Sequence, residues 1–113
     1  MEESVKLTII YDLYSPLLTD KQREVFDYYY MNDYSLSEIA ELCKVSKASV
    51  FDLINRTKAK LYDFEVKLKL FEKHMAKQNI YEDIQKNLDK LKSRDKNIDL
   101  FEKSIEALKN LDL

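Results

Sequence analysis

Apolar residues recur at helical spacing along the whole chain. Over residues 4–14 they lie three and four positions apart on a wide surface, which predicts a helix covered on more than one side. Ser15-Pro16 ends this helix, because the residue before proline is biased away from helical conformation. Two shorter helices are predicted next, with N-caps at Thr19 and Ser35, and Glu38 completes a capping box with Ser35.

The longest apolar pattern follows Ser46, which is a good N-cap. Its spacing alternates between four and three residues, which is a heptad seam: Val50, Ile54, Thr57, Leu61, Phe64, Leu68, Phe71 and Met75. Neither proline nor glycine interrupts it, so we expect one unbroken helix from Lys47 to about Lys77. The remaining pattern predicts a break at residues 78–79, a helix over 80–91, a connector at 93–95 and a last short helix over 98–108.

Composition narrows the fold and excludes several kinds of chemistry. The chain has no glycine and one proline, which excludes glycine-rich phosphate loops and disfavours the tight turns of β folds. We therefore predict an all-α fold. One cysteine and one histidine exclude a disulfide framework and a Cys/His zinc site. No nucleophile–base pair is evident, so we expect no catalytic residue, no cofactor, no metal and no enzyme activity.

The chain also lacks the signals of a membrane or secreted protein. No apolar stretch approaches the roughly 20 residues that cross a bilayer. The first residues, Met1-Glu2-Glu3, are acidic, unlike those of a signal peptide. We expect a cytoplasmic protein with no membrane span.

The second, third and fourth predicted helices have the pattern of a helix-turn-helix. Ala40 would keep the crossing close, Val45 would fill the angle, and Val50 and Ile54 would face inward. Small or polar outward residues would then reach bases, and residues farther along would meet the phosphate backbone. The predicted base contacts are Ser46, Lys47, Ala48, Ser49 and Asp52, and the predicted backbone contacts are Asn55, Arg56, Lys58 and Lys60.

Three segments, residues 18–26, 34–41 and 45–51, together resemble region four of bacterial sigma factors, the helix-turn-helix that contacts the −35 promoter element. The similarity is closer to the small YlxM/p13 proteins, through residues 17–22, 33–36, 50–57 and 62–68. That family's usual turn glycine, arginine and glutamine are Lys44, Lys47 and Ala48 here. The resemblance implies a helix-turn-helix regulator. It also implies a link to the signal recognition particle pathway, through gene neighbourhood.

Charge is unevenly distributed, although the net formal charge is only −2. Residues 1–45 hold four bases against nine acids, a net charge of −5. Residues 46–60 hold four bases against one acid, a net charge of +3, and residues 67–77 have the same balance. The positive charge therefore coincides with the predicted reading helix, which favours DNA binding of weak to moderate affinity.

We expect residues 1–65 to form a helix-turn-helix domain, winged-helix-like or sigma region four-like, and residues 66–113 to form a long helical arm. The seam needs either the last helices of the same chain or a second copy to cover it, which makes a homodimer our expectation. Its contact residues would be Leu61, Phe64, Leu68, Phe71 and Met75. Two functions remain open: a dimeric DNA-binding regulator, or an adaptor that binds signal recognition particle protein or RNA without binding DNA.

Overall fold

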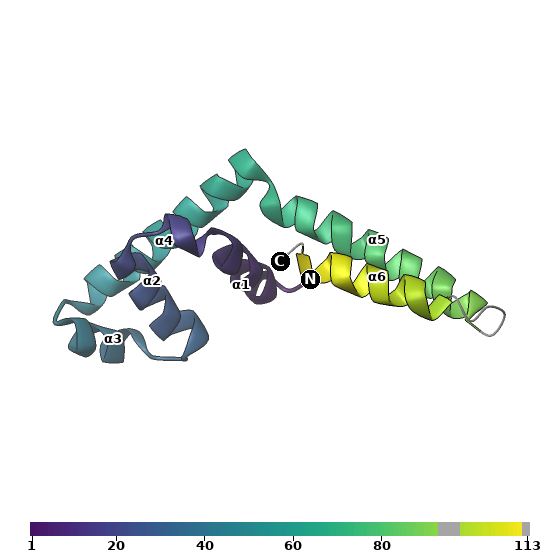
Figure 1. The fold of residues 1–113 in the computed structure, drawn as a ribbon. Helices are drawn as coiled ribbons and strands as arrows, with labels where there is room; N and C mark the ends of the chain where they lie inside the picture. Colours follow the sequence, from purple (N-terminus) through teal and green to yellow (C-terminus); the bar gives the residue numbers. More distant parts are fainter. Residues whose placement is uncertain (93–97, 112–113) are drawn as a thin grey trace. The chain divides into compact units, whose positions relative to one another are not determined.

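The computed structural model describes residues 1–92 and 98–111, and these residues contain helices and no strand (Figure 1). The elements, in chain order, are α1 (Glu3–Tyr14), the 3-10 turn η1 (Ser15–Leu17), α2 (Asp20–Phe26), the π-helical turn η2 (Asp27–Met31), α3 (Leu36–Cys43), α4 (Lys47–Leu68), α5 (Leu70–Leu91) and α6 (Ile98–Leu111). The all-α prediction is confirmed. The chain forms two compact units, Met1–Phe71 and Glu72–Leu113.

Side-chain caps begin α2, α3 and α4 where the sequence predicts them. Thr19 Oγ1 accepts the backbone N–H of Gln22 at 3.2 Å, and Gln22 Oε1 accepts the N–H of Thr19 at 2.9 Å. Ser35 and Glu38 form the same reciprocal pair at 3.1 and 3.2 Å. Each pair satisfies backbone donors that have no partner inside the helix.

The predicted unbroken helix to Lys77 is wrong, because α4 ends at Leu68. Lys69 takes the left-handed conformation with φ 56° and donates its N–H to the carbonyl of Glu65 at 2.8 Å. Helix α5 begins at once with Leu70. The expected break at residues 78–79 is also wrong, since α5 continues through it to Leu91.

Packing within the first unit explains the early end of α4. The N–H groups of Leu70 and Phe71 open α5 and need acceptors. The Tyr14 hydroxyl accepts the first at 3.0 Å, and Glu65 Oε1 accepts the second at 2.9 Å. Both donors are satisfied, so the interruption does not cost the hydrogen bonds of these two groups.

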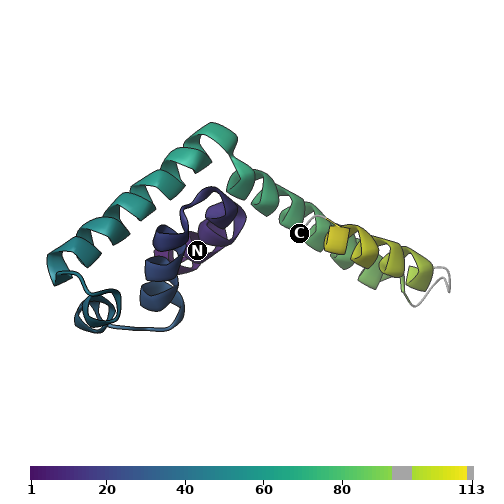
Figure 2. The ribbon, with the colours of Figure 1, turned by 60° about the vertical axis from the view of Figure 1, so that its left-hand side comes forward.

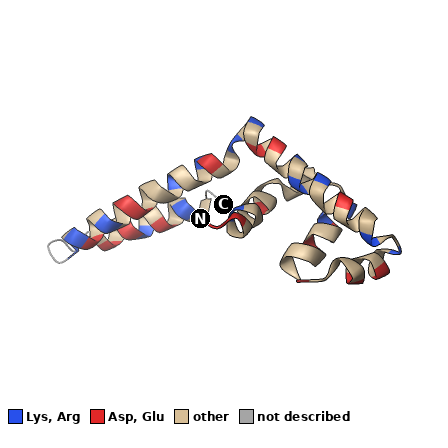
Figure 3. Ribbon diagram, turned by 180° about the vertical axis from the view of Figure 1, so that it is seen from behind, with Lys and Arg blue, Asp and Glu red and all other residues tan. Residues whose placement is uncertain are grey.

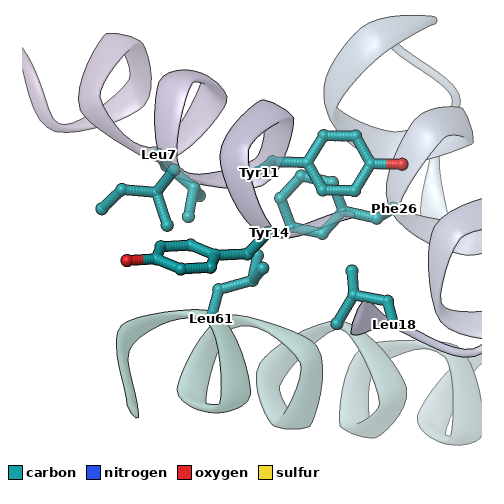
Figure 4. Close-up of a cluster of buried hydrophobic side chains, with 7 residues drawn as sticks. Leu7, Tyr11, Tyr14, Leu18, Phe26 and Leu61 are labelled. Atoms are coloured by element: carbon teal, nitrogen blue, oxygen red, sulfur yellow. The ribbon is translucent and has the colours of Figure 1, made fainter. Parts of the chain in front are cut away.

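The core of the first unit consists of two neighbouring clusters. The first joins α1, α2 and α4, with the Tyr11 ring stacked on Phe26 at a centroid distance of 4.4 Å. Its buried members, most of them labelled in Figure 4, are Leu7, Ile10, Tyr11, Tyr14, Leu18, Phe26 and Leu61. The second joins α2, α3 and α4 through Val25, Ile39, Val50 and Ile54.

Val45 does not fill the angle between α3 and α4, so that prediction is wrong. Its side chain is 44% exposed, while its N–H donates to the carbonyl of Ala40 at 3.0 Å. The core at this corner closes with Ile39 and Val50 instead. The turn is therefore fixed by its backbone hydrogen bond and by the left-handed Lys44.

In the second unit, α5 and α6 lie side by side, as Figures 1 and 2 both show. Tyr81 on α5 and Ile98 on α6 are buried, and the Lys109 Nζ lies 5.9 Å from the centroid of the Tyr81 ring. The predicted last helix is confirmed as α6, and the predicted connector at 93–95 lies outside the described residues. None of the described helices is long and apolar enough to span a bilayer.

Candidate nucleic-acid interface

Helix α4 has one face in the core and the opposite face in solvent. Its buried residues are Val50, Ile54, Thr57 and Leu61, which repeat at helical spacing and pack against α1, α2 and α3. Thr57 is tolerated there because its hydroxyl donates to the carbonyl of Leu53 at 2.8 Å. The inward positions of Val50 and Ile54 are as predicted, and they fix which side chains can meet a ligand.

The structure leaves seven of the nine predicted contact residues exposed: Ser46, Lys47, Ala48, Ser49, Asp52, Asn55 and Arg56. At the start of α4, the Ser46 hydroxyl accepts the N–H of Ser49 at 3.1 Å and lies 2.8 Å from the Ser49 hydroxyl. These two hydroxyls are therefore engaged in the cap. Ala48 has only a methyl group, so a ligand can approach the helix backbone closely at this turn.

Asp52 and Arg56 form an ion pair one turn apart on α4. Arg56 Nη2 lies 2.5 Å from Asp52 Oδ2, and the two side chains are 75% and 57% exposed, respectively. An exposed pair of this kind contributes little to stability, so Arg56 can leave it for a phosphate at small cost. Asp52 would repel phosphates, but as an acceptor it can take a hydrogen bond from the amino group of cytosine.

Lys58 and Lys60 differ from the other predicted contacts because they are half-buried. The Nζ of Lys58 lies 6.0 Å from the centroid of the Tyr30 ring. The Nζ of Lys60 lies 3.3 Å from Gln22 Oε1 and 5.9 Å from the centroid of the Phe64 ring. The two lysines thus lie on opposite flanks of α4, and each is packed against neighbouring residues of the first unit.

Phe51 is an exposed residue of α4 that the predicted contact set omits. Its side chain is 56% exposed and it lies one turn after Lys47 and one turn before Asn55. A contact set chosen for hydrogen-bonding and charged residue types leaves out a phenylalanine. The position of residue 51 in the helix could have identified it as outward-facing, since it lies about 100° around the helix from the buried Val50.

Helix α3 is purely acidic, whereas α4 carries both basic and acidic residues, as the coloured ribbon in Figure 3 illustrates. Helix α3 carries Glu38 and Glu41 and no basic residue. Tyr34, Leu42 and these two glutamates line a surface hollow of about 370 Å³. The Tyr34 ring is held by stacking on Tyr28 at a centroid distance of 5.1 Å.

The predicted dimer residues do not form one exposed seam. Leu61 is fully buried, and Phe64 and Phe71 pack against the same core cluster of the first unit. Leu68 is 46% exposed, and Met75 belongs to the second unit and is half-buried. The break at Lys69 therefore divides a pattern that is continuous in the sequence.

Among the described residues, no three His, Cys, Asp or Glu side chains gather in a way that could hold a metal ion. The described part of the interface therefore offers backbone, hydroxyl, amide, aromatic and charged groups. Such an arrangement can bind a polyanion and contact base edges.

Comparison with known proteins identifies the family. Residues 1–101 match a family model described as "Putative helix-turn-helix protein, YlxM / p13 like". A UPF0122 protein of Thermoanaerobacter sp. (strain X514) is 43% identical over 90 residues, which cover 80% of this chain and 77% of that protein. A UPF0122 protein of Clostridium botulinum is 42% identical over 112 residues, covering 96% of this chain and 100% of that protein. One from Listeria welshimeri is 33% identical over 111 residues, covering 98% of both. The chain therefore belongs to the UPF0122 family of YlxM/p13-like proteins.

Proposed function

We propose that this protein is a cytoplasmic regulator that binds duplex DNA through α4. The observation that carries the proposal is the exposure of Lys47, Asn55 and Arg56 on a helix that has another face fixed in the core. In a helix-turn-helix the second helix enters the major groove and its first residues contact base edges. Helix α4 follows α3 and a three-residue turn, which is the required order.

Different exposed residues of α4 would make different kinds of contact with DNA. Arg56 would contact phosphates and supply a part of the affinity that depends on salt, and Asn55 would hold the backbone beside it. Lys47, in the first turn of α4, would face the bases, and Asp52 can accept a hydrogen bond from cytosine. Lys58 and Lys60 would add positive potential from the two flanks of the helix.

Dimerisation is the second part of the proposal, and it would double the contact set. The second unit contains residues 72–113, a span of 42 residues that holds most of α5 and all of α6. A unit of this size can bury little apolar surface alone, and oligomerisation commonly stabilises such units. Its large exposed apolar residues are Ile80, Leu91, Leu100, Phe101, Leu108 and Leu111. Two copies that join these faces would form a four-helix bundle.

Binding of duplex DNA measured over a salt series tests the proposal. We expect an affinity that falls steeply with salt, with about 0.9 of log–log slope for each phosphate contacted. Arg56→Glu should weaken binding and reduce the slope, while Lys86→Glu on α5 should change neither. Binding that is absent at low salt, or that Arg56→Glu leaves unchanged, would refute the proposal.

A second candidate function is supported by the hollow on α3. Its two glutamates, the fixed Tyr34 ring and the exposed Leu42 suit a basic side chain with an apolar stem. An adaptor could use this surface to bind a basic protein, and the family resemblance makes the protein component of the signal recognition particle the partner to test, with the particle RNA, which the glutamates would repel, as the comparison. Capture of purified particle components by the wild-type protein but not by Glu41→Lys would favour this function over DNA binding.

A further inference from the structure

Phe51 is an exposed residue of α4 that takes no part in the core. The inward face of α4 is complete with Val50, Ile54, Thr57 and Leu61, and Phe51 points away from it with 56% of its side chain in solvent. Single exposed apolar residues are common on protein surfaces. Phe51 differs from such residues in its place, because it lies within the strip that contains Lys47 and Asn55.

The neighbours of Phe51 on α4 make a small apolar surface within this polar strip. Ala48 lies three residues before Phe51, so the two side chains are neighbours on the helix surface. The alanine methyl group is short, which leaves the larger ring free to project beyond it. Val45, in the turn that leads into α4, is also 44% exposed. Phe51 and Ala48 thus place apolar groups on the first turns of α4, the part of a reading helix that contacts base edges.

The major groove offers one apolar group to such a surface. Thymine alone among the four bases presents a methyl group there, at C5. A phenylalanine ring makes no ordinary hydrogen bond to a base edge, so covering that methyl group is the most favourable contact it can make. Placing the ring against a cytosine amino group would remove water from a polar group and replace it with nothing.

We propose that Phe51, together with the methyl group of Ala48, makes the protein prefer sites with thymine next to the first turns of α4. This inference rests on the proposed DNA binding and adds a specificity that charge alone cannot supply. Burying one methyl group favours binding by about three- to five-fold.

The experiment removes the methyl group and keeps every hydrogen bond. Duplexes are selected from a random pool by the full-length protein at about 50 mM salt, where phosphate contacts remain strong. Each selected duplex is then made with uracil in place of thymine, one position at a time. We expect the wild-type protein to lose about three- to five-fold in affinity at one or two positions. We also expect Phe51→Ala to bind the thymine and uracil forms equally.

Two further variants show whether the effect belongs to this ring. Phe51→Leu keeps an apolar side chain and should retain part of the preference for thymine. Val66→Ala removes an exposed apolar side chain from the far end of α4 and should leave the preference intact. Circular dichroism verifies that each variant is folded.

The outcomes separate this inference from the proposed function. Salt-dependent binding with equal affinity for thymine and uracil at every position would overturn the role of Phe51 and leave DNA binding intact. A preference for thymine that persists in Phe51→Ala would assign it to another residue. Failure of the wild-type protein to bind any duplex would overturn both.

Discussion

The Tyr14 hydroxyl donates a hydrogen bond to Glu65 Oε1 at 2.7 Å, although 51 residues separate the two in the sequence. The same tyrosine oxygen accepts the N–H of Leu70, and the same carboxylate oxygen accepts the N–H of Phe71. One pair of side chains thus joins α1 to α4 and caps the first residues of α5. The Tyr14 ring is fully buried beside Leu61, as Figure 4 shows, so its hydroxyl is held in place by packing.

Removing the Tyr14 hydroxyl should destabilise the first unit. Tyr14→Phe keeps the ring but removes the hydrogen bond to the Glu65 carboxylate and the acceptor of the Leu70 N–H, so we expect a loss of about 1–3 kcal/mol in the free energy of unfolding. Urea unfolding followed by circular dichroism measures this loss. Tyr62→Phe is the matched control, because the Tyr62 hydroxyl donates to Glu3 at an exposed position and should contribute less. Equal losses in the two variants would contradict the capping role of Tyr14.

The same tyrosines predict a loss of stability at alkaline pH. Burial, and secondarily the hydrogen bond to Glu65, raises the pKa of Tyr14 from 10.0 to about 12. Burial and the hydrogen bond to Glu3 raise the pKa of Tyr62 to about 12 as well. Burial, followed by a 2.7 Å hydrogen bond to Asp27, raises the pKa of Tyr11 strongly. In each case the neutral phenol is favoured in the folded state.

The direction of the pH effect follows from linkage. A group whose pKa is higher in the folded than in the unfolded state contributes its full stabilisation below the unfolded value. The urea midpoint should therefore be steady up to about pH 9.5 and should fall as the pH rises from about 10 towards 12. Tyr14→Phe should have a lower midpoint at neutral pH and a shallower alkaline decline. A decline of unchanged steepness in that variant would assign the effect to other groups.

Lys44 predicts a stabilising substitution. It ends α3 in the left-handed conformation with φ 55°, where a residue with a Cβ atom is strained by roughly 1–2 kcal/mol. Lys44→Gly relieves that strain and increases the entropy of the unfolded chain, so we expect a net gain of about 0.5–1 kcal/mol in the free energy of unfolding. Ala59→Gly, inside the exposed face of α4, should instead cost about 1 kcal/mol. A loss of stability in Lys44→Gly would show that the lysine side chain itself supports the turn.

Local signals in the sequence were sufficient to predict where three helices start and which face of α4 lies in the core. The helix starts after Thr19, Ser35 and Ser46 could be predicted because each cap hydrogen bond joins residues only three apart in the sequence. The period of Val50 and Ile54 identifies the core side for the same local reason. This was enough to place most of the predicted interface in solvent.

The end of α4 could not be predicted in this way, because its causes are distant in the sequence. Neither glycine nor proline marks Lys69, and the heptad pattern passes through it. The helix stops there because Tyr14 supplies an acceptor from 56 residues away. Phe64 and Phe71 are likewise drawn into the cluster around α1, so residues that seemed to need a partner chain find partners within their own unit.

The consequence for the proposed dimer is that its interface should lie on the second unit. Leu100, Phe101 and Leu108 on α6 are 63%, 59% and 47% exposed, which is a large apolar surface for so small a unit. If a second copy covers it, Phe101→Glu should convert the dimer to a monomer, as measured by light scattering, because a buried carboxylate without a partner is strongly unfavourable. Leu68→Glu is the matched control, since Leu68 belongs to the predicted seam and is exposed on the first unit.

Dimer loss also has a consequence for DNA binding. A Phe101→Glu monomer keeps an intact α4 but offers one reading helix instead of two, so its log–log salt slope should be about half that of the wild type. If Leu68→Glu disrupts the dimer and Phe101→Glu does not, the interface lies on the seam predicted from the heptads. A wild-type protein that is monomeric at all concentrations would refute dimerisation through either surface, and DNA binding would then have to rest on one copy of α4.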